Sequence, residues 1–436
     1  MGTTGKERKN MLIHVIKQGD TLWKLSQQYG VSAERLASDN GITNPRRLMI
    51  GQALAVLQPA RTYTVRRGDT VDSVARRFGL PPIELIQNNP DLASAPVLRP
   101  GRMLTIRFEG EKRRTITLNG YVYPYVQRAV LAYALPFMTY VTIFGYGFTE
   151  NGDLIPIDDQ PILDLAARFQ TAPVMLLSAI TEDGTFNSAR ASLLFGDPAL
   201  QEKVLDEVLA VMLSKGYAGL DIDFEYIPPE VTEGYLDFIE RAAEKLNPYG
   251  FFVNTDLAPK TSGTQRGLLY EAHDYAEVGS RSDTVLLMTY EWCYTFGPPM
   301  AVAPLDKVRQ VVEYAVTEIP AQKILMGLPN YGYVWRLPYE RGFTQASSIG
   351  NQYAVDLAAR YGAEIQFDGP AASPFFRYTS GGAQHIVWFE DVRSMNAKFE
   401  LMDAYGLLGG GYWNLMRPFN QNFAFLSGTY HIRKVR

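Results

Sequence analysis

The sequence predicts an α/β protein in which a (β/α)8 TIM barrel follows two small βααβ modules. Two observations lead to this prediction. The first quarter of the chain contains an internal repeat, and the rest alternates short apolar runs with amphipathic helical stretches. The 436 residues are too many for one small domain and suit two or three.

The repeat covers residues 13–57 and 62–108, and we expect modules at 11–58 and 61–109. Its aligned positions are two Gly-Asp-Thr turns and two asparagines: Gly19-Asp20-Thr21 with Gly68-Asp69-Thr70, and Asn40 with Asn89. In each copy a strand-like run leads into the turn, and the Asp or Thr can cap the helix that follows. A second short helix ends at the asparagine and a closing strand follows, so each copy predicts βααβ.

As a set, these features resemble a tandem of LysM modules, which bind N-acetylglucosamine-containing glycans. The resemblance places the sugar in a groove between the Gly-Asp-Thr loop and the loop before the last strand. The implied binding residues are Asp20, Thr21, Leu22, Leu48 and Ile50 in copy one, and Asp69, Thr70, Val71 and Leu98 in copy two. The alternative is that the polar residues only cap helices and the apolar residues only pack. The second groove departs from the first because Pro100 stands where copy one has Ile50.

From about residue 112 to 436 the pattern predicts the barrel. Eight apolar runs are expected to be its strands: 137–148, 172–181, 219–226, 251–259, 284–292, 323–331, 385–391 and 406–413. Helical stretches such as 198–215 and 230–246 separate them, and strands that alternate with helices pair in parallel. Eight such units fit a closed barrel, with a doubly wound open sheet as the alternative. Residues 336–384 predict a small α+β excursion at the barrel mouth, with a helix at 351–361.

Three acidic residues, Asp221, Asp223 and Glu225, alternate along the third of these runs. Alternate side chains of a strand share one face, about 6.6 Å apart along it, so the three acids point into the barrel. Crowded carboxylates in an enclosed space repel each other, and at least one should keep a proton near neutral pH. A protonated carboxyl can act as a general acid, and Glu225 lies nearest the end of the strand where barrel active sites form. The alternative is an edge strand with its charges in solvent, which the apolar flanking residues disfavour.

The stretch 217–225 resembles the Asp-x-x-Asp-x-Asp-x-Glu signature of family 18 glycoside hydrolases, with Ala218 in place of the first acid. Other stretches are similar to further family motifs: Met288-Thr289-Tyr290-Glu291, Gly327-Leu328-Pro329-Asn330-Tyr331-Gly332, and Trp413 at the end of the last run. Of the family's Ser-x-Gly-Gly motif only Ser178 remains. The outermost acid belongs to the supporting acids and not to the reacting groups. Its replacement by Ala218 is therefore expected to affect the tuning of the site more than the presence of activity.

The resemblance implies a retaining mechanism in which the substrate's own N-acetyl oxygen attacks the anomeric carbon. Glu225 would protonate the leaving oxygen and then activate water, Asp223 would orient the acetamide, and Asp221 would share a proton with Asp223. Tyr290 would hold the acetamido group and Trp413 would stack on the sugar, with Met288 and Tyr331 as further substrate-binding residues. For Tyr290 and Trp413 the alternative is aromatic core packing.

Two LysM copies ahead of such a barrel resemble the cortical-fragment-lytic N-acetylglucosaminidases of spore-forming bacteria. This resemblance implies a peptidoglycan partner, a location in the spore coat, cortex or cell wall, and repeats that hold the enzyme on glycan and raise its local concentration. A chitinase acting on poly-N-acetylglucosamine is the second hypothesis. A non-catalytic glycan-binding spore-coat protein is the third, although relatives with that role lack the acid at position 225.

Composition excludes several other classes. A net charge of −4 gives no basic surface for nucleic acid, and four scattered histidines and one cysteine predict neither a metal site nor a disulfide. No apolar run reaches the roughly 18 residues of a membrane span. The N-terminal MGTTGKERKN lacks the hydrophobic run of a signal peptide, so we expect no such signal. No cofactor is expected, and we expect a monomer.

Overall fold

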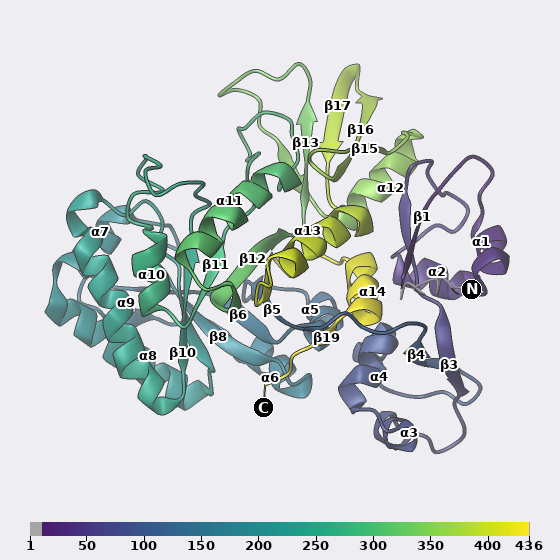
Figure 1. Ribbon diagram of the computed structural model, residues 1–436, viewed down its shortest axis with the longest axis horizontal. Helices are drawn as coiled ribbons and strands as arrows, with labels where there is room; N and C mark the ends of the chain where they lie inside the picture. The colour runs from purple at the N-terminus through teal and green to yellow at the C-terminus, as the bar shows by residue number, and fades with distance from the viewer. Residues whose placement is uncertain (1–10, 436) are drawn as a thin grey trace, which may run out of the picture.

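The computed structural model describes residues 11–435, arranged as two small modules beside a large barrel (Figure 1). The first ten residues, on which the expectation about a signal peptide rests, lie outside the described residues. Both modules have the predicted βααβ order. Module 1 consists of β1 (Leu12–Val15), α1 (Leu22–Tyr29), α2 (Ala33–Asp39) and β2 (Ala53–Val56). Module 2 consists of β3 (Pro59–Thr64), α3 (Val71–Phe78), α4 (Pro82–Asn88), a 3-10 turn (Pro90–Ala93) and β4 (Met103–Phe108).

In each Gly-Asp-Thr turn the Asp and the Thr have different structural roles. Thr21 caps α1 by accepting a hydrogen bond from the backbone N–H of Lys24, and Thr70 forms a capping box with Ser73 at the start of α3. Asp20 closes its turn by accepting the backbone N–H of Lys17 at 2.8 Å, and Asp69 closes the second turn in the same way. The motif therefore specifies where each first helix begins.

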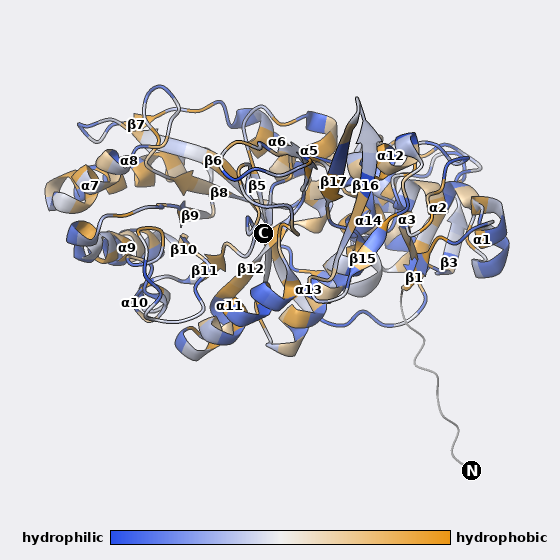
Figure 2. Ribbon diagram, turned by 90° about the horizontal axis from the view of Figure 1, so that it is seen from above, coloured by the Kyte–Doolittle hydropathy of each residue, from blue (hydrophilic) through white to orange (hydrophobic). Residues whose placement is uncertain are grey.

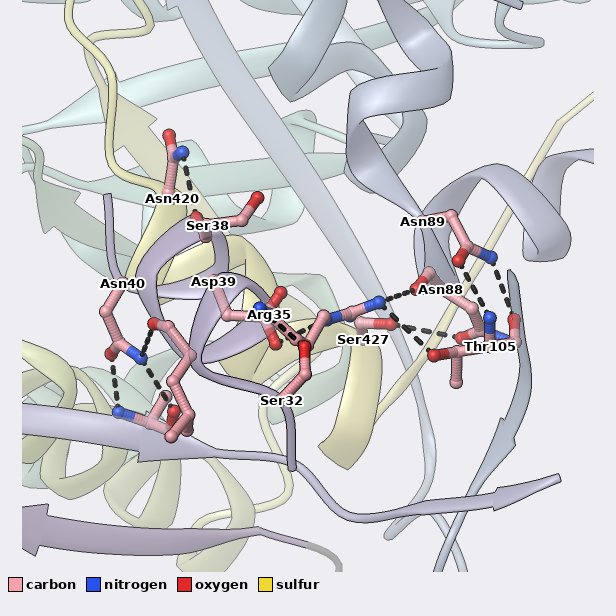
Figure 3. Close-up of polar contacts among 12 residues, drawn as sticks. Ser32, Arg35, Ser38, Asp39, Asn40, Asn88, Asn89, Thr105, Asn420 and Ser427 are labelled. Atoms are coloured by element: carbon pink, nitrogen blue, oxygen red, sulfur yellow. Dashed lines mark hydrogen bonds and ion pairs between the residues drawn. The ribbon is translucent and has the colours of Figure 1, made fainter. Parts of the chain in front are cut away.

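The two repeated asparagines complete the sheets of their modules. The Asn40 side chain donates to the carbonyls of Leu36 and Ala55, and its Oδ1 accepts the N–H of Ala55. Asn89 makes the same three bonds in module 2, with Leu85 and Thr105 (Figure 3). Each amide thus links the end of the second helix to the closing strand, which explains why both copies have asparagine at this position.

Eight parallel strands close the barrel. In spatial order they are β5 (Thr115–Val122), β6 (Tyr140–Phe148), β8 (Ala172–Leu177), β9 (Gly219–Ile222), β10 (Phe252–Leu257), β11 (Thr284–Leu287), β12 (Ile324–Pro329) and β18 (Gly409–Trp413). Pairing of β5 with both β6 and β18 joins the two ends of the sheet. The (β/α)8 prediction is confirmed and the open sheet is excluded.

One predicted strand was wrong and one was missed. The run 385–391 falls on β17 (Ala383–Trp388), which pairs antiparallel in a separate sheet instead of joining the barrel. The first barrel strand is β5, which the sequence interpretation did not include among the eight runs. The acidic row therefore lies on the fourth strand of the barrel, not the third.

The separate sheet belongs to a small α+β region inserted between β12 and β18. It consists of β13 (Gly332–Arg336), β14 (Ser347–Ile349), α12 (Asn351–Tyr361), β15 (Gln366–Asp368), β16 (Ser373–Ser380) and β17. In Figure 1 this sheet stands above the barrel strands, beside α11 (Leu305–Glu318). The insertion thereby forms a wall at one end of the barrel.

Amphipathic helices surround the barrel and bury one face against it. They are α5 (Arg128–Ala134), α6 (Gln160–Arg168), α7 (Ser188–Gly196), α8 (Pro198–Lys215), α9 (Thr232–Leu246), α10 (Tyr275–Arg281), α11 and α13 (Val392–Ala404). The last helix, α14 (Asn420–Thr429), is instead buried on all sides. Figure 2 shows hydrophobic and hydrophilic residues mixed along these helices, as expected for helices that cover a sheet. Two short strands, β7 (Leu154–Ile155) and β19 (His431–Ile432), extend β6 and β5 on the outside.

Helix α14 joins both modules to the barrel. Gln421 donates to Asn40 Oδ1 and to the carbonyl of Ala53 in module 1, and Ser427 donates to Asn88 Oδ1 in module 2. Arg35 connects the modules to each other, since it pairs with Asp39 at 2.7 Å and donates to the carbonyl of Asn88 (Figure 3). These contacts are largely buried, so the modules are docked on the barrel instead of being tethered to it.

Within residues 11–435 no helix is long and apolar enough to cross a membrane. Over the same range the structure gathers no group of His, Cys, Asp and Glu side chains suited to holding a metal ion. Cys293 is buried with a free thiol.

Candidate active site

The acidic row points into the barrel as predicted. Asp221 is fully buried and Asp223 nearly so, whereas Ile222 and Phe224 point outward under the helices. The Phe224 ring packs against Phe195 of α7 at a centroid distance of 5.0 Å. The alternation of the strand therefore separates an acidic interior from an apolar exterior, and an exposed edge strand is excluded.

Glu225 lies just beyond the end of β9, on the wall of a cleft of about 1010 Å³. Met288, Tyr290 and Glu291 line the same cleft. Solvent reaches the carboxyl, but the cleft walls withdraw part of its hydration. This desolvation raises the pKa of Glu225, and the nearby Glu291 carboxylate raises it further. Glu225 is therefore accessible to a substrate while tending to keep its proton.

The backbone turns sharply on both sides of this cleft. Tyr226 and Glu291 adopt left-handed conformations, with φ of 55° and 62°, which residues with a Cβ rarely adopt. Tyr226 directly follows Glu225, and Glu291 directly follows Tyr290. Such conformations cost about 1–3 kcal/mol each and tend to persist at functional sites. Here they set the direction in which Glu225 and Tyr290 leave their strands.

Beneath Glu225 lies a buried group of three carboxyls that the sequence interpretation found only in part. Asp256 on β10 joins Asp221 and Asp223, and it accepts hydrogen bonds from the Tyr121 hydroxyl at 2.8 Å and from Asn254 at 3.1 Å. Asn254 also donates to Asp221 at 2.7 Å. Burial raises the pKa of all three carboxyls. Repulsion from Glu225 and Asp221 adds to the shift of Asp223, and repulsion from Asp221 and Asp223 adds to the shift of Asp256. The site therefore holds protons that isolated aspartates would have lost.

An aromatic floor lies across the barrel from Glu225. Trp413 at the end of β18 stacks with Tyr290 at a centroid distance of 6.3 Å and an interplanar angle of 19°. Tyr121, Tyr123 and Phe144 pack against the same indole ring at tilted or edge-to-face angles. Trp413 is only partly buried. The structure thus brings Tyr290 and Trp413 together beside the carboxyls.

Tyr331 has a different position from the one its predicted role suggests. It is nearly buried, and its hydroxyl donates to Glu291 Oε1 at 2.5 Å, with Tyr333 donating to the same carboxylate at 3.1 Å. Burial raises the pKa of Glu291, while the two tyrosine hydroxyls oppose that shift. Tyr331 is therefore placed to fix Glu291, a residue that sequence reasoning quoted in a motif but did not include among the site residues.

Two further groups hold the loop that carries Glu225. The His273 Nε2 lies 3.0 Å from the carbonyl of Phe224, and its Nδ1 accepts the N–H of Ala258 at 2.8 Å. Burial lowers the pKa of His273 to about 4, so the ring is neutral and Nε2 carries the proton that it donates to Phe224. On the other side, the Ser178 hydroxyl donates to the carbonyl of Asp223 at 2.5 Å. Ser178, the remnant of the incomplete motif, therefore supports the acidic strand.

The residues predicted to bind glycan in the two modules lie at the expected loops. Leu22 is buried in the hydrophobic core of module 1 and Leu48 packs against that core, whereas Ile50, two residues after Leu48, is 40% exposed. Asp20, Thr21, Asp69 and Thr70 make the turn and capping bonds described above, and in module 2 Leu98 packs in the core with Val71 against it. Glycan binding by either module stays a prediction.

A closed parallel barrel with an acidic row at the carboxyl edge of one strand is typical of glycosidases. Residues 120–417 match the model of Glycosyl hydrolases family 18, and residues 14–56 and 63–107 match the LysM domain. The chain belongs to family 18 and is a glycosidase that carries two LysM modules.

Within this family, the chain is similar to several relatives over nearly its whole length. The chain is 38% identical to the Cortical fragment-lytic enzyme of Bacillus subtilis (strain 168), over 97% of this chain and 99% of that protein. It is similar over 98% of its length to the crystal structure of the spore cortex-lytic enzyme SleL of Bacillus megaterium QM B1551, with a TM-score of 0.82, 33% identity and all of that chain covered. The Bacillus cereus SleL structure matches with the same TM-score and identity, over 97% of this chain and 99% of that one. The resemblance to cortex-lytic enzymes is confirmed.

Proposed function

We propose that this glycosidase is an N-acetylglucosaminidase that cleaves peptidoglycan fragments of the spore cortex, with Glu225 as its acid and base. The observation that carries the proposal is the position of Glu225 on the wall of the cleft, above a buried row of carboxyls and across from Trp413. The relatives named cortex-lytic or cortical fragment-lytic enzymes support the choice of substrate.

In the first step Glu225 gives its proton to the glycosidic oxygen as the bond to the anomeric carbon breaks. The acetamido oxygen of the same sugar forms a new bond to that carbon from the opposite face, the leaving group departs as a neutral alcohol, and the positive charge on the sugar is balanced by the ionised Glu225. Burial and the neighbouring Glu291 raise the pKa of Glu225, which favours the protonated form that the first step needs. A sugar without the 2-acetamido group could not react in this way.

The intermediate carries a positive charge on its acetamido ring, which the buried aspartates stabilise. Asp223 orients the acetamide N–H and faces this charge, with Asp221 behind it. Tyr290 holds the acetamido group, and Trp413 stacks on the sugar face. Glu225, now ionised, then takes a proton from water as the water attacks the anomeric carbon, which restores the original configuration.

The LysM modules would hold the enzyme on its polymeric substrate. Because both modules are docked on α14, a glycan bound there would stand at a fixed offset from the cleft. This arrangement suits a protein that works at the spore cortex or cell wall, where the relatives' names place their activity.

The test compares wild type with Glu225→Gln and Asp223→Asn on cortex fragments and on chitin oligomers. Loss of the general acid should lower kcat by about 10²–10⁴-fold in Glu225→Gln, with the substrate still bound. Mass spectrometry of the products identifies the bond that is cut and the end from which cleavage proceeds. Faster turnover of chitin than of cortex fragments would favour a chitinase, and equal release of reducing ends by wild type and Glu225→Gln would refute the proposed role of Glu225.

A further inference from the structure

The cleft beside Glu225 continues past this carboxyl into a region that takes no part in the steps above. Its walls there are the loop 259–270 after β10, the loop 291–294 after β11 and the start of α11. Tyr290 lines the cleft and stacks with Trp413, but Trp413 itself does not line it, so the cleft extends from Tyr290 away from the indole. With the reacting sugar stacked on Trp413, the leaving sugar comes to lie in this region.

Within residues 11–435 a single cation lines this cleft. The other charged side chains on its walls are Glu225 and Glu291, and Lys307 of α11 supplies the one positive charge. Lys307 is exposed, and its ammonium group forms no ion pair or hydrogen bond with another residue of that range. The ammonium group of Lys203, by contrast, pairs with Asp153 at 2.7 Å. Lys307 is therefore available to pair with an anionic group of a ligand.

The fold determines which side of α11 faces the cleft. The helix begins at Leu305, whose N–H donates to the carbonyl of Ala371 at 3.0 Å. Lys307 and Gln310 both line the cleft, as expected from their spacing, because residues three apart lie on the same side of a helix. Arg309 of the same helix is also exposed but is not part of the cleft wall. The helix thus presents one cation and one amide to a ligand in the cleft.

Peptidoglycan and chitin differ in the sugar that such a cation would meet. Peptidoglycan alternates N-acetylglucosamine with N-acetylmuramic acid, whose 3-O-lactyl ether ends in a carboxylate or carries a peptide with its own carboxylate. An enzyme that cuts on the reducing side of N-acetylglucosamine therefore expels N-acetylmuramic acid, an anionic leaving sugar. In chitin the leaving sugar is another N-acetylglucosamine, which has no charge. A cation on the leaving side favours only the first polymer.

We propose that Lys307 is a specificity-determining residue whose ammonium group binds the carboxylate on the 3-O-substituent of the leaving N-acetylmuramic acid. Gln310 lies on the same side of α11, and its amide can donate to the same substituent. Glu225 and Trp413 meet the same N-acetylglucosamine in both polymers, so they cannot distinguish them, whereas the charge pair at Lys307 does. This inference rests on the proposed function and names the part of the substrate that the leaving side of the cleft recognises.

The test measures kcat/KM of wild type, Lys307→Met and Lys307→Arg on four tetrasaccharides. Two carry a carboxylate: the peptidoglycan tetrasaccharide with free lactyl groups, and the same compound with L-alanine on each lactyl group. Two are uncharged at this position: the peptidoglycan tetrasaccharide with its lactyl carboxylates converted to amides, and chitotetraose.

Lys307→Met should lower kcat/KM by about 5- to 20-fold on a carboxylate-bearing substrate, because a charge-assisted hydrogen bond at a solvent-accessible site is lost. On the amide and on chitotetraose the change should stay within about twofold. Lys307→Arg keeps the charge and should stay within about threefold of wild type on all four. A loss confined to the free lactyl substrate assigns the carboxylate of the sugar itself, and a loss confined to the alanyl substrate assigns that of the peptide.

The matched control is Arg309→Met, which removes the same charge from the same helix outside the cleft and should change kcat/KM by less than about twofold on every substrate. Raising the salt concentration should lower the kcat/KM of wild type on the carboxylate-bearing substrates and leave that of Lys307→Met nearly constant. Equal losses on the charged and uncharged substrates in Lys307→Met would overturn the proposal, as would unchanged values on both charged substrates.

Glu225→Gln separates this inference from the proposed function. If Glu225→Gln is fully active, the proposed role of Glu225 fails, whereas the ratio of kcat/KM between the free and amidated tetrasaccharides still decides whether Lys307 recognises a carboxylate. If Glu225→Gln is inactive, calorimetric binding of the four tetrasaccharides to Glu225→Gln, with and without Lys307→Met, gives the same comparison without turnover. Equal affinities of the two proteins for the charged substrates would contradict the proposal.

Discussion

Gly327 on β12 offers a direct test of how closely the barrel positions Tyr290. A Cβ at this position would lie 2.6 Å from the carbonyl oxygen of Leu287, 2.7 Å from Tyr290 Cε1 and 2.8 Å from the N atom of Thr289. Two of these atoms belong to the backbone near the end of β11, which cannot move without disturbing the barrel. The Tyr290 ring would therefore have to move by roughly 0.7 Å to reach an ordinary contact distance.

We expect Gly327→Ala to destabilise the fold by about 1–3 kcal/mol, the usual cost of overpacking. It should also lower kcat by about 10- to 100-fold, because a displacement approaching 1 Å in a positioning group has effects of this size. The assays are urea unfolding followed by far-UV circular dichroism, and turnover of the fragment that wild type cleaves. Gly196→Ala on α7 is the control, since its Cβ would meet nothing within 4 Å. Wild-type kcat in a clearly destabilised Gly327→Ala would refute the link between this glycine and Tyr290.

The other predictions concern buried charges. Lys398 and Glu390 form an ion pair at 2.9 Å with both side chains fully buried, so Lys398→Met should cost about 3–5 kcal/mol in urea unfolding at neutral pH. Adding Glu390→Gln should recover most of that loss; no recovery would contradict the reasoning. The three buried carboxyls of β9 and β10 have raised pKa values, so the folded state binds more protons than the unfolded state. Their stabilising contribution is complete below the ordinary carboxyl pKa and is lost as pH rises through the raised values, by about 1.4 kcal/mol per pH unit for each extra proton. Replacing two of them by asparagine should flatten this dependence; an unchanged slope would assign it to other groups.

The missed strand β5 shows where a hydrophobic pattern loses information. Its inward-facing residues include Thr117 and Asn119, which line a cavity of about 210 Å³ at the barrel floor below Asp221. Asn119 and Thr142 of β6 satisfy each other by hydrogen bonds, so polar residues are tolerated at this position. A search for apolar runs therefore passes over this strand. The run at 385–391 has the opposite problem, because an apolar strand in a small antiparallel sheet has the same appearance as a barrel strand.

The candidate site likewise contains residues that the sequence predicted and residues that it did not. Glu225 and its row were predictable because alternation along one strand requires only local sequence. Asp256, Asn254 and Tyr121 were not, because they reach the site from other strands and no fixed spacing connects them to the signature. The one local signal was a pair of alternating polar residues within the apolar run at 251–259. In a barrel whose strands pair side by side, such a pair on the neighbouring strand indicates a partner for the acidic row.

The two modules hold a fixed position relative to the barrel, which bears on how the predicted glycan binding would affect catalysis. Residues 421–429 of α14 are all buried, and Gln421 and Ser427 each bond a different module from this helix. Moving either module would expose apolar surface and break buried hydrogen bonds, each of which contributes about 1 kcal/mol. A flexible linker raises effective concentration for any ligand within its reach, whereas a fixed module does so only for a glycan long enough to span the distance to the cleft. If the modules bind glycan as predicted, this fixed geometry would favour polymeric substrates independently of the affinity of the individual grooves.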